Sequence, residues 1–175
     1  MCGVVGLLAV AIHNTGSSAG AAWGGLAAIF VCGLPMAFVL KGVRDGRWDD
    51  HHVADRNKRA LPLLVALASV IVGALLLAIV QAPRELVALV LTVVPELVIA
   101  IAVSHWWKIS IHAAVIAGLV GVLMVLYGPG ALVGLPLVAL VAWSRRVLDA
   151  HSWPQVWVGA ALGWIVAVVA FSLLR

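Results

Sequence analysis

Charged side chains are scarce in this chain of 175 residues, since Asp, Glu, Lys and Arg together make up only 10% of it. In soluble globular domains about a quarter of the residues are charged, so this composition argues against a soluble domain. Cysteine is scarcer still, because Cys2 and Cys32 are the only two. Two cysteines so far apart in the sequence argue against a disulfide framework and against a cysteine-based metal site.

Hydrophobic residues, in contrast, make up 65% of the chain, and its mean hydropathy is +1.17. The apolar stretches reach the roughly 20 residues that an α-helix needs to cross a hydrocarbon core of about 30 Å. The sequence therefore predicts an all-α fold, a polytopic transmembrane helical bundle. We expect residues 1–175 to form a single transmembrane domain, with any active site inside the bundle or at its rim.

Hydropathy and helix-breaking residues predict about six to seven membrane-inserted helices. These cover approximately residues 2–13, 20–40, 60–80, 85–105, 112–127, 131–144 and 153–174. A charged loop, residues 41–59, separates the second helix from the third. Pro83 and Pro154 stand where two of the later helices are expected to begin, and proline suits the first turn of a helix.

Two short polar clusters stand at the ends of very apolar helices. They combine two cations, two serines and two histidines: Lys108, Ser110 and His112 in the first cluster, and Ser144, Arg145 and His151 in the second. Ionisable groups near hydrocarbon are costly, so their presence at these junctions indicates chemistry on an anionic group.

Counting helices places both clusters and the charged loop on one face of the membrane. Two predicted helices lie between Arg59 and His112, and two more lie between His112 and Arg145. Only Arg84 and Arg175 lie on the other face, whereas nine basic residues flank this one: Lys41, Arg44, Arg47, Arg56, Lys58, Arg59, Lys108, Arg145 and Arg146. The positive-inside rule therefore predicts that this face is cytoplasmic.

These residue types suit phosphate chemistry. Arginine offers a planar fork of donors to phosphate oxygens, and serine hydroxyls and the amides of a helix N-terminus add further donors. One neutral imidazole can attack phosphorus while a second, protonated imidazole gives its proton to the leaving alcohol oxygen. Two histidines in separate loops are the minimum for this reaction.

The clusters resemble motifs of the type 2 phosphatidic acid phosphatases, membrane enzymes related to the vanadium haloperoxidases. That family has a lysine followed seven residues later by Arg-Pro, a Pro-Ser-Gly-His, and a Ser-Arg with a histidine six and an aspartate ten residues after the arginine. The resemblance covers about residues 59–155. The matching residues are Arg59 in the first motif, Ser110 and His112 in the second, and Ser144, Arg145 and His151 in the third.

The resemblance implies a metal-independent hydrolase that acts on phosphate monoesters or diphosphates of lipids, without a cofactor. His151 would be the nucleophile that forms a phosphohistidine, and His112 would be the general acid. Arg59, Ser110 and Arg145 would bind the phosphate, together with Ser144 and Lys108. The implied location is a bacterial cell membrane, with a lipid phosphate and the bilayer as partners and no nucleic acid.

Departures from the family pattern fall in all three motifs. His52 stands in the place of the first lysine, Ala60 replaces the proline, and Ile109 and Ile111 flank Ser110. Lys58 and Lys108 are both candidates for the missing cation, and the shared helix face of Lys108 and His112 slightly favours Lys108.

Gln155 occupies the position of the aspartate that orients the nucleophile. Its carbonyl oxygen can accept the imidazole N–H and fix the tautomer of His151, but it cannot stabilise the imidazolium by charge.

Two other functions remain open. The Asp-rich loop 45–59 could bind magnesium with a diphosphate, as in membrane prenyltransferases, although no second acidic motif is present and a solvated segment with internal ion pairs is the simpler interpretation. The chain could also be a small non-catalytic membrane protein or a permease. Glu96, after Pro95, is an intramembrane acid, and therefore either a functional group or a neutral hydrogen-bonding group between helices.

Overall fold

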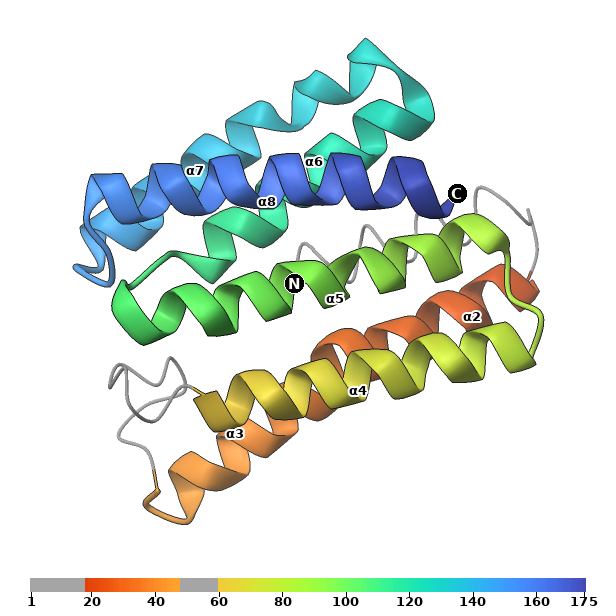
Figure 1. Cartoon of the computed structure of the whole chain (residues 1–175), viewed down its shortest axis with the longest axis horizontal. Coiled ribbons are helices and arrows are strands. Elements are labelled where there is room, and N and C mark those ends of the chain that lie inside the picture. The colour runs from red at the N-terminus through yellow and green to blue at the C-terminus, as the bar shows by residue number, and fades with distance from the viewer. Residues whose placement is uncertain (1–17, 48–59) are drawn as a thin grey trace.

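The computed structural model describes residues 18–47 and 60–175, and every regular element in them is helical (Figure 1). The elements are the α-helices α2 (Ser18–Ala28), α3 (Leu34–Arg44), α4 (Ala60–Ile79), α5 (Arg84–Trp106), α6 (Ile111–Tyr127), α7 (Leu135–Val147) and α8 (Trp153–Leu174), the π-helix η1 (Ile29–Gly33) and the 3₁₀-helix η3 (Pro129–Gly134). The predicted all-α helical bundle is confirmed.

Within the described residues, five helical stretches are long and apolar enough to cross a membrane: Ala19–Arg44, Ala60–Ile79, Arg84–Trp106, Pro129–Val147 and Trp153–Leu174. The helix Ile111–Tyr127 is apolar but shorter, at 17 residues. The six helices expected from residue 20 onward are therefore all present, and the helix expected at 2–13 lies outside the described residues.

The charged loop predicted for residues 41–59 begins later than expected. Lys41 and Arg44 form the last turn of α3, and the chain turns only at Gly46. Basic side chains are favourable there because the C-terminal end of a helix has a partial negative charge. Residues 48–59 lie outside the described residues.

A π-helical segment interrupts the first described span. η1 widens the helix between α2 and α3, and Ser69 on α4 donates its hydroxyl to the carbonyl oxygen of Phe30 at 2.6 Å. Gly73 makes room for the ring, since a Cβ at this position would lie 2.5 Å from Cβ of Phe30. In hydrocarbon a freed backbone carbonyl needs such a donor from a neighbouring helix.

Small residues let α6 and α8 approach until their backbones are in contact. A Cβ on Gly159 would lie 2.6 Å from the carbonyl oxygen of Ser110, and a Cβ on Gly163 would overlap the backbone of Ala114. The two facing stripes have four-residue spacing: Ser110, Ala114 and Gly118 on α6, and Gly159, Gly163 and Ala167 on α8. Without a hydrophobic driving force between helices, such close packing is what holds membrane helices together. We call this contact the α6–α8 seam.

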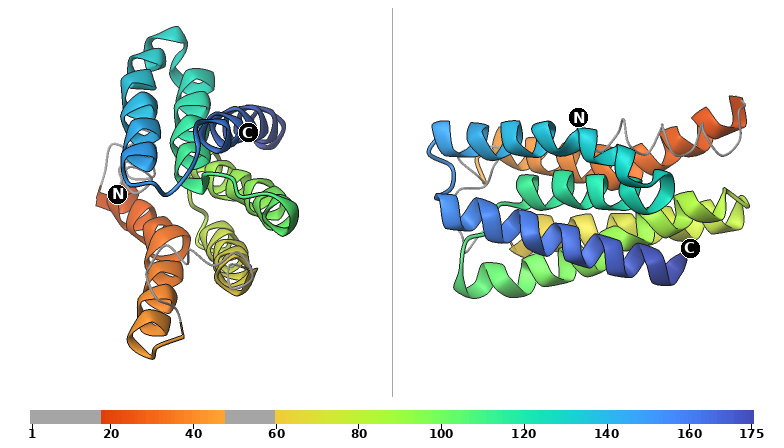
Figure 2. Two further views of the ribbon diagram at one scale, coloured as in Figure 1. Left: turned by 90° about the vertical axis from the view of Figure 1, so that its left-hand side faces the viewer. Right: turned by 90° about the horizontal axis from the view of Figure 1, so that it is seen from above.

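The helix ends group at opposite ends of the bundle. α3, α5 and α7 finish at the end where α4, α6 and α8 begin, as Figure 1 and the right-hand view of Figure 2 show. We call it the motif end, because it includes the α5–α6 connection with Lys108, the first turn of α6 with His112 and the α7–α8 connection with His151. Both polar clusters therefore lie at the same end of the helical bundle.

Candidate functional site at the motif end

The second cluster is shaped by the way α7 ends. The amide of Asp149 donates to the carbonyl of Arg146 at 3.0 Å, and that of Ala150 donates to the carbonyl of Arg145 at 3.1 Å. Asp149 has a φ of 48°, in the left-handed region. This is a Schellman cap, in which a left-handed residue turns the chain back over the last carbonyls. The amide of His151 also donates to the Arg145 carbonyl, at 3.3 Å, so the cap brings the backbone of His151 back to Arg145.

The start of α8 fixes the same loop from its other side. The backbone N–H of Ser152, the N-cap, donates to Oε1 of the Gln155 side chain at 3.0 Å. In return, the Ser152 side chain accepts from the backbone N–H of Gln155. This capping box satisfies two amides that would otherwise lack partners at the helix start. The side chain of Gln155, predicted to orient His151, therefore binds backbone. It acts on His151 by fixing the loop that contains it.

The first cluster is attached to α8 through Ser110. The Ser110 amide donates to the carbonyl of Gln155 at 3.1 Å, and its Oγ accepts the amide of Ala113 at 3.4 Å as the N-cap of α6. Ser110 is fully buried, and its backbone lies against Gly159. Ser110 thus joins the beginning of α6 to the beginning of α8, at one end of the α6–α8 seam.

This attachment brings Lys108 to the loop that contains His151. Three of the predicted site residues, Lys108, His151 and Gln155, line one open recess together with Arg146 and Asp149. Lys108 and His151 are half-buried, and Nδ1 of His151 is shielded from solvent. The recess combines two cations, one carboxylate and an imidazole, a charge balance that favours an anionic ligand.

Arg146 and Asp149 are the members of the recess that sequence reasoning missed. Nη1 of Arg146 and Oδ1 of Asp149 lie 2.6 Å apart, and both side chains are exposed. Their i, i+3 spacing at the end of a predicted helix could have indicated the pair. An exposed ion pair of this kind contributes little to stability, so Arg146 can be shared with an anion.

Three further candidates, Ser144, Arg145 and His112, are described but do not line this recess. Arg145 is half-buried and donates Nε to Oγ of Ser144 at 3.3 Å, while Ser144 donates to the carbonyl of Val141 at 2.9 Å. His112 is exposed on the first turn of α6. Three predicted residues, Arg59, His52 and Lys58, lie outside the described residues.

No group of three or more His, Cys, Asp or Glu side chains that could hold a metal ion occurs within residues 18–47 and 60–175. Of the Asp-rich loop, the structure describes Asp45, whose carboxylate lies 3.0 Å from the guanidinium of Arg47. Comparisons with family models, curated proteins and solved structures find no match to this chain. The function is therefore argued from the geometry of the motif end.

Proposed function

We propose that this chain is an integral-membrane phosphatase that hydrolyses a lipid phosphate through a phosphohistidine. One observation supports this above the others: the hydrogen bond from the Ser110 amide to the Gln155 carbonyl, which brings two clusters forty residues apart in sequence to one place. Lys108 from one cluster and His151 from the other then line a single recess.

In the proposed reaction the neutral imidazole of His151 attacks phosphorus, and the bond from phosphorus to the lipid oxygen breaks. His112 gives its proton to that oxygen, so the lipid of a monophosphate substrate leaves as an alcohol. With a diphosphate, attack at the terminal phosphorus breaks its bond to the bridging oxygen, and the lipid leaves as its monophosphate. Deprotonated His112 then takes a proton from water, which attacks the phosphohistidine and releases inorganic phosphate and free His151. Both roles suit a group that titrates near neutral pH.

The cations have separate tasks in this proposal. Lys108 and Arg146 line the recess and neutralise the phosphate oxygens. The guanidinium groups of Arg145 and of Arg59, which lies outside the described residues, supply bidentate donors. Ser144 supports Arg145 through the hydrogen bond between them. Ser110 was predicted to bind phosphate, but its complete burial favours positioning of the backbone.

The substrate class follows from the location of the recess. A phosphate site at the end of a transmembrane bundle is reached by an amphiphile whose chain stays in the hydrocarbon. Isoprenoid phosphates or diphosphates, phosphatidate-like lipids and lipid-linked sugar phosphates share this form. The basic residues around the motif end favour a cytoplasmic orientation, since Arg84 and Arg175 are the cations at the opposite end of the described helices.

The test is phosphate release from a panel of these lipids by the purified protein and its variants. We expect His151→Ala to abolish turnover and His112→Ala to reduce it by about 10²- to 10⁴-fold, the usual contribution of general acid catalysis. His105→Ala is the matched control, because His105 lies at the same end on α5 and stacks edge-on against Trp106. Full activity of both test variants would refute the proposal.

A chelator distinguishes the proposed phosphatase from the alternative, magnesium-dependent function. The proposed reaction needs no metal, so we expect EDTA to leave phosphate release unchanged. Loss of turnover in EDTA, restored by magnesium, would favour the prenyltransferase-like function of the Asp-rich loop instead.

A further inference from the structure

A second polar group, remote from the motif end, lies in the middle of the bundle. Glu96 follows Pro95 in α5, ten residues before the helix ends at Trp106. At 1.5 Å per residue it lies about 15 Å from that end, halfway through a hydrocarbon core of about 30 Å. Intramembrane carboxyl groups are rare and costly, and so they are functional candidates.

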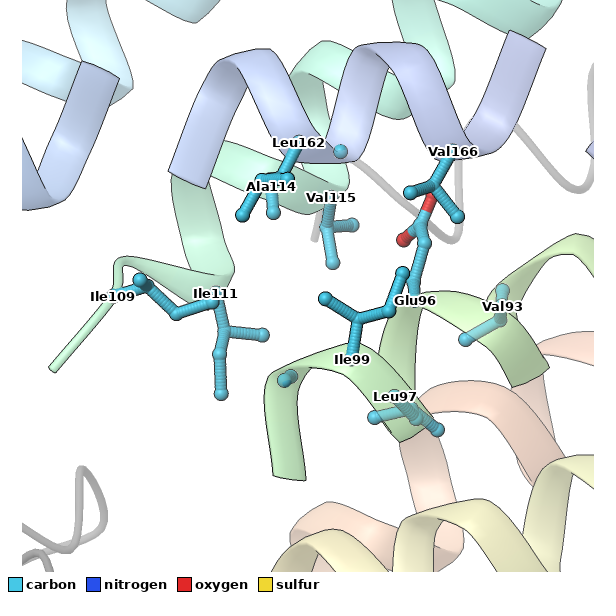
Figure 3. A pocket seen from close by; sticks show the side chains of 12 residues that line it. Val93, Glu96, Leu97, Ile99, Ile109, Ile111, Ala114, Val115, Leu162 and Val166 are labelled. Atoms are coloured by element: carbon cyan, nitrogen blue, oxygen red, sulfur yellow. The ribbon is translucent and has the colours of Figure 1, made fainter. Parts of the chain in front are cut away.

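The carboxyl group of Glu96 has no hydrogen-bond or ion-pair partner among residues 18–47 and 60–175. It reaches from α5 toward Val166 on α8, among aliphatic side chains (Figure 3). Gly118 leaves room for it, since a Cβ at this position would lie 2.7 Å from Oε1 of Glu96. The carboxyl group of Glu96 therefore packs against the backbone of α6 at Gly118.

Glu96 lies between two cavities. The smaller one runs between α5, α6 and α8 and is lined by Ile109 and Ile111 at its motif end. The larger one, about 260 Å³ in volume, is lined by side chains from η1, α4, α5, α6 and α8. A cavity of this size has room for several water molecules or a small organic ligand.

The polar lining of the larger cavity is almost limited to the carboxyl group. The hydroxyl of Thr92 is engaged, since it donates to the carbonyl of Ala88 at 2.8 Å. The other titratable group in the lining is the thiol of Cys32, on the π-helix η1. π-Helical segments are frequent at functional sites, and this one forms a wall of the cavity.

Apart from Glu96 itself and Cys32, the titratable side chains of residues 18–47 and 60–175 do not line either cavity. On α5 itself Glu85 and His105 are eleven and nine residues from Glu96, and on α6 His112 is six residues before Gly118. α4 and α8 contribute only aliphatic and small residues to the two linings. Because no cation of the described residues lines either cavity, an ionised Glu96 needs a positive charge from outside them, surrounded by apolar groups that match the walls.

We propose that this cavity binds a lipophilic monocation, such as an organic ammonium ion, whose charge pairs with the Glu96 carboxylate in competition with a proton. The apolar body of the ligand replaces water against the aliphatic walls, and its charge offsets the cost of an ionised carboxyl group in hydrocarbon. This site is independent of the phosphatase activity proposed for the motif end.

The test uses benzyltrimethylammonium as the probe and the full-length protein in detergent, with binding measured by equilibrium dialysis. We expect saturable binding that weakens as the pH falls, because protons compete for the carboxylate. Neopentylbenzene, the neutral probe of the same shape, should not displace the cation. Glu96→Gln should weaken binding more than about tenfold, as expected for loss of a buried charge partner. Glu85→Gln, the same change at the membrane boundary of α5, should leave binding unchanged.

Equal binding by Glu96→Gln, equal competition by neopentylbenzene, or binding independent of pH would each overturn the proposal. Thermal unfolding of Glu96→Gln shows whether the variant is folded. If Glu96→Gln is not folded, the pH dependence of binding and the competition by neopentylbenzene, both measured on the parent protein, still test the proposal. Phosphate release by Glu96→Gln distinguishes this site from the motif end, because we expect it to equal that of the parent protein.

Discussion

The α6–α8 seam and the space between α5 and α6 are two regions of one bundle with opposite packing. In the seam, glycines bring backbone against backbone, and the polar groups at its end are engaged in helix caps. Between α5 and α6 there are cavities, and the carboxyl group of Glu96 has no partner within the described residues. The seam holds a site in position, whereas the cavities leave room for a ligand.

The largest effect on stability is expected from placing a bulky side chain in the α6–α8 seam. Gly163→Leu should destabilise the protein by about 2 kcal/mol or more, because even the Cβ would overlap the backbone of Ala114, which a side-chain rotation cannot relieve. Unfolding followed by circular dichroism in detergent measures the loss. The control is Gly25→Leu on α2, where a Cβ has no atom within 4 Å. Equal stability of the two variants would show that the seam is not the main structural contact.

A smaller effect is expected at the loop that the seam positions. Gln155→Ala should destabilise by about 1 kcal/mol through loss of the capping box, and it should also slow phosphate release by loosening the His151 loop. Gln155→Glu keeps the same reach and acceptor, so we expect it to retain the stability of the parent. A loss of activity in Gln155→Ala with unchanged stability would instead indicate direct contact between Gln155 and the reacting groups.

The smallest effect on stability is expected at two helix C-caps of the same form. Gln81 after α4 and Asp149 after α7 both adopt a positive φ, 54° and 48°, in Schellman caps. Gln81→Gly should stabilise the protein by about 0.5–1 kcal/mol, because glycine has no steric penalty in this region. Asp149→Gly should gain less, since it removes the ion pair with Arg146. Chemical unfolding measures both changes, and a larger gain for Asp149→Gly would show that its ion pair is not stabilising.

Hydropathy predicted the helices well because crossing the hydrocarbon core sets both their length and their composition. The expected helices 60–80, 85–105 and 153–174 compare with Ala60–Ile79, Arg84–Trp106 and Trp153–Leu174. The π-helix η1 was not predictable in this way, because it depends on the hydroxyl of Ser69 and the space above Gly73 on another helix.

The motif end was predicted in part. Helix counting placed Lys108 and His151 at the same end, but only the Ser110–Gln155 hydrogen bond shows that they share a recess. The role of Gln155 was readable from the sequence, since a serine followed three residues later by glutamine is a capping box. The small-residue stripes of α6 and α8 could also have been predicted, from their four-residue spacing in the sequence. Arg146 was counted only as an orientation signal, because its place beside His151 results from the cap of α7.

The most direct test of the account is to trap the covalent intermediate. The purified protein is mixed with a lipid phosphate, quenched in alkali, where phosphohistidine survives, and digested for mass spectrometry. We predict a phosphate group on His151, lost on treatment with acid, and none on the same peptide of His151→Ala. Phosphate release without any phosphorylated histidine, or with the phosphate on another residue, would contradict the assignment of His151 as the nucleophile.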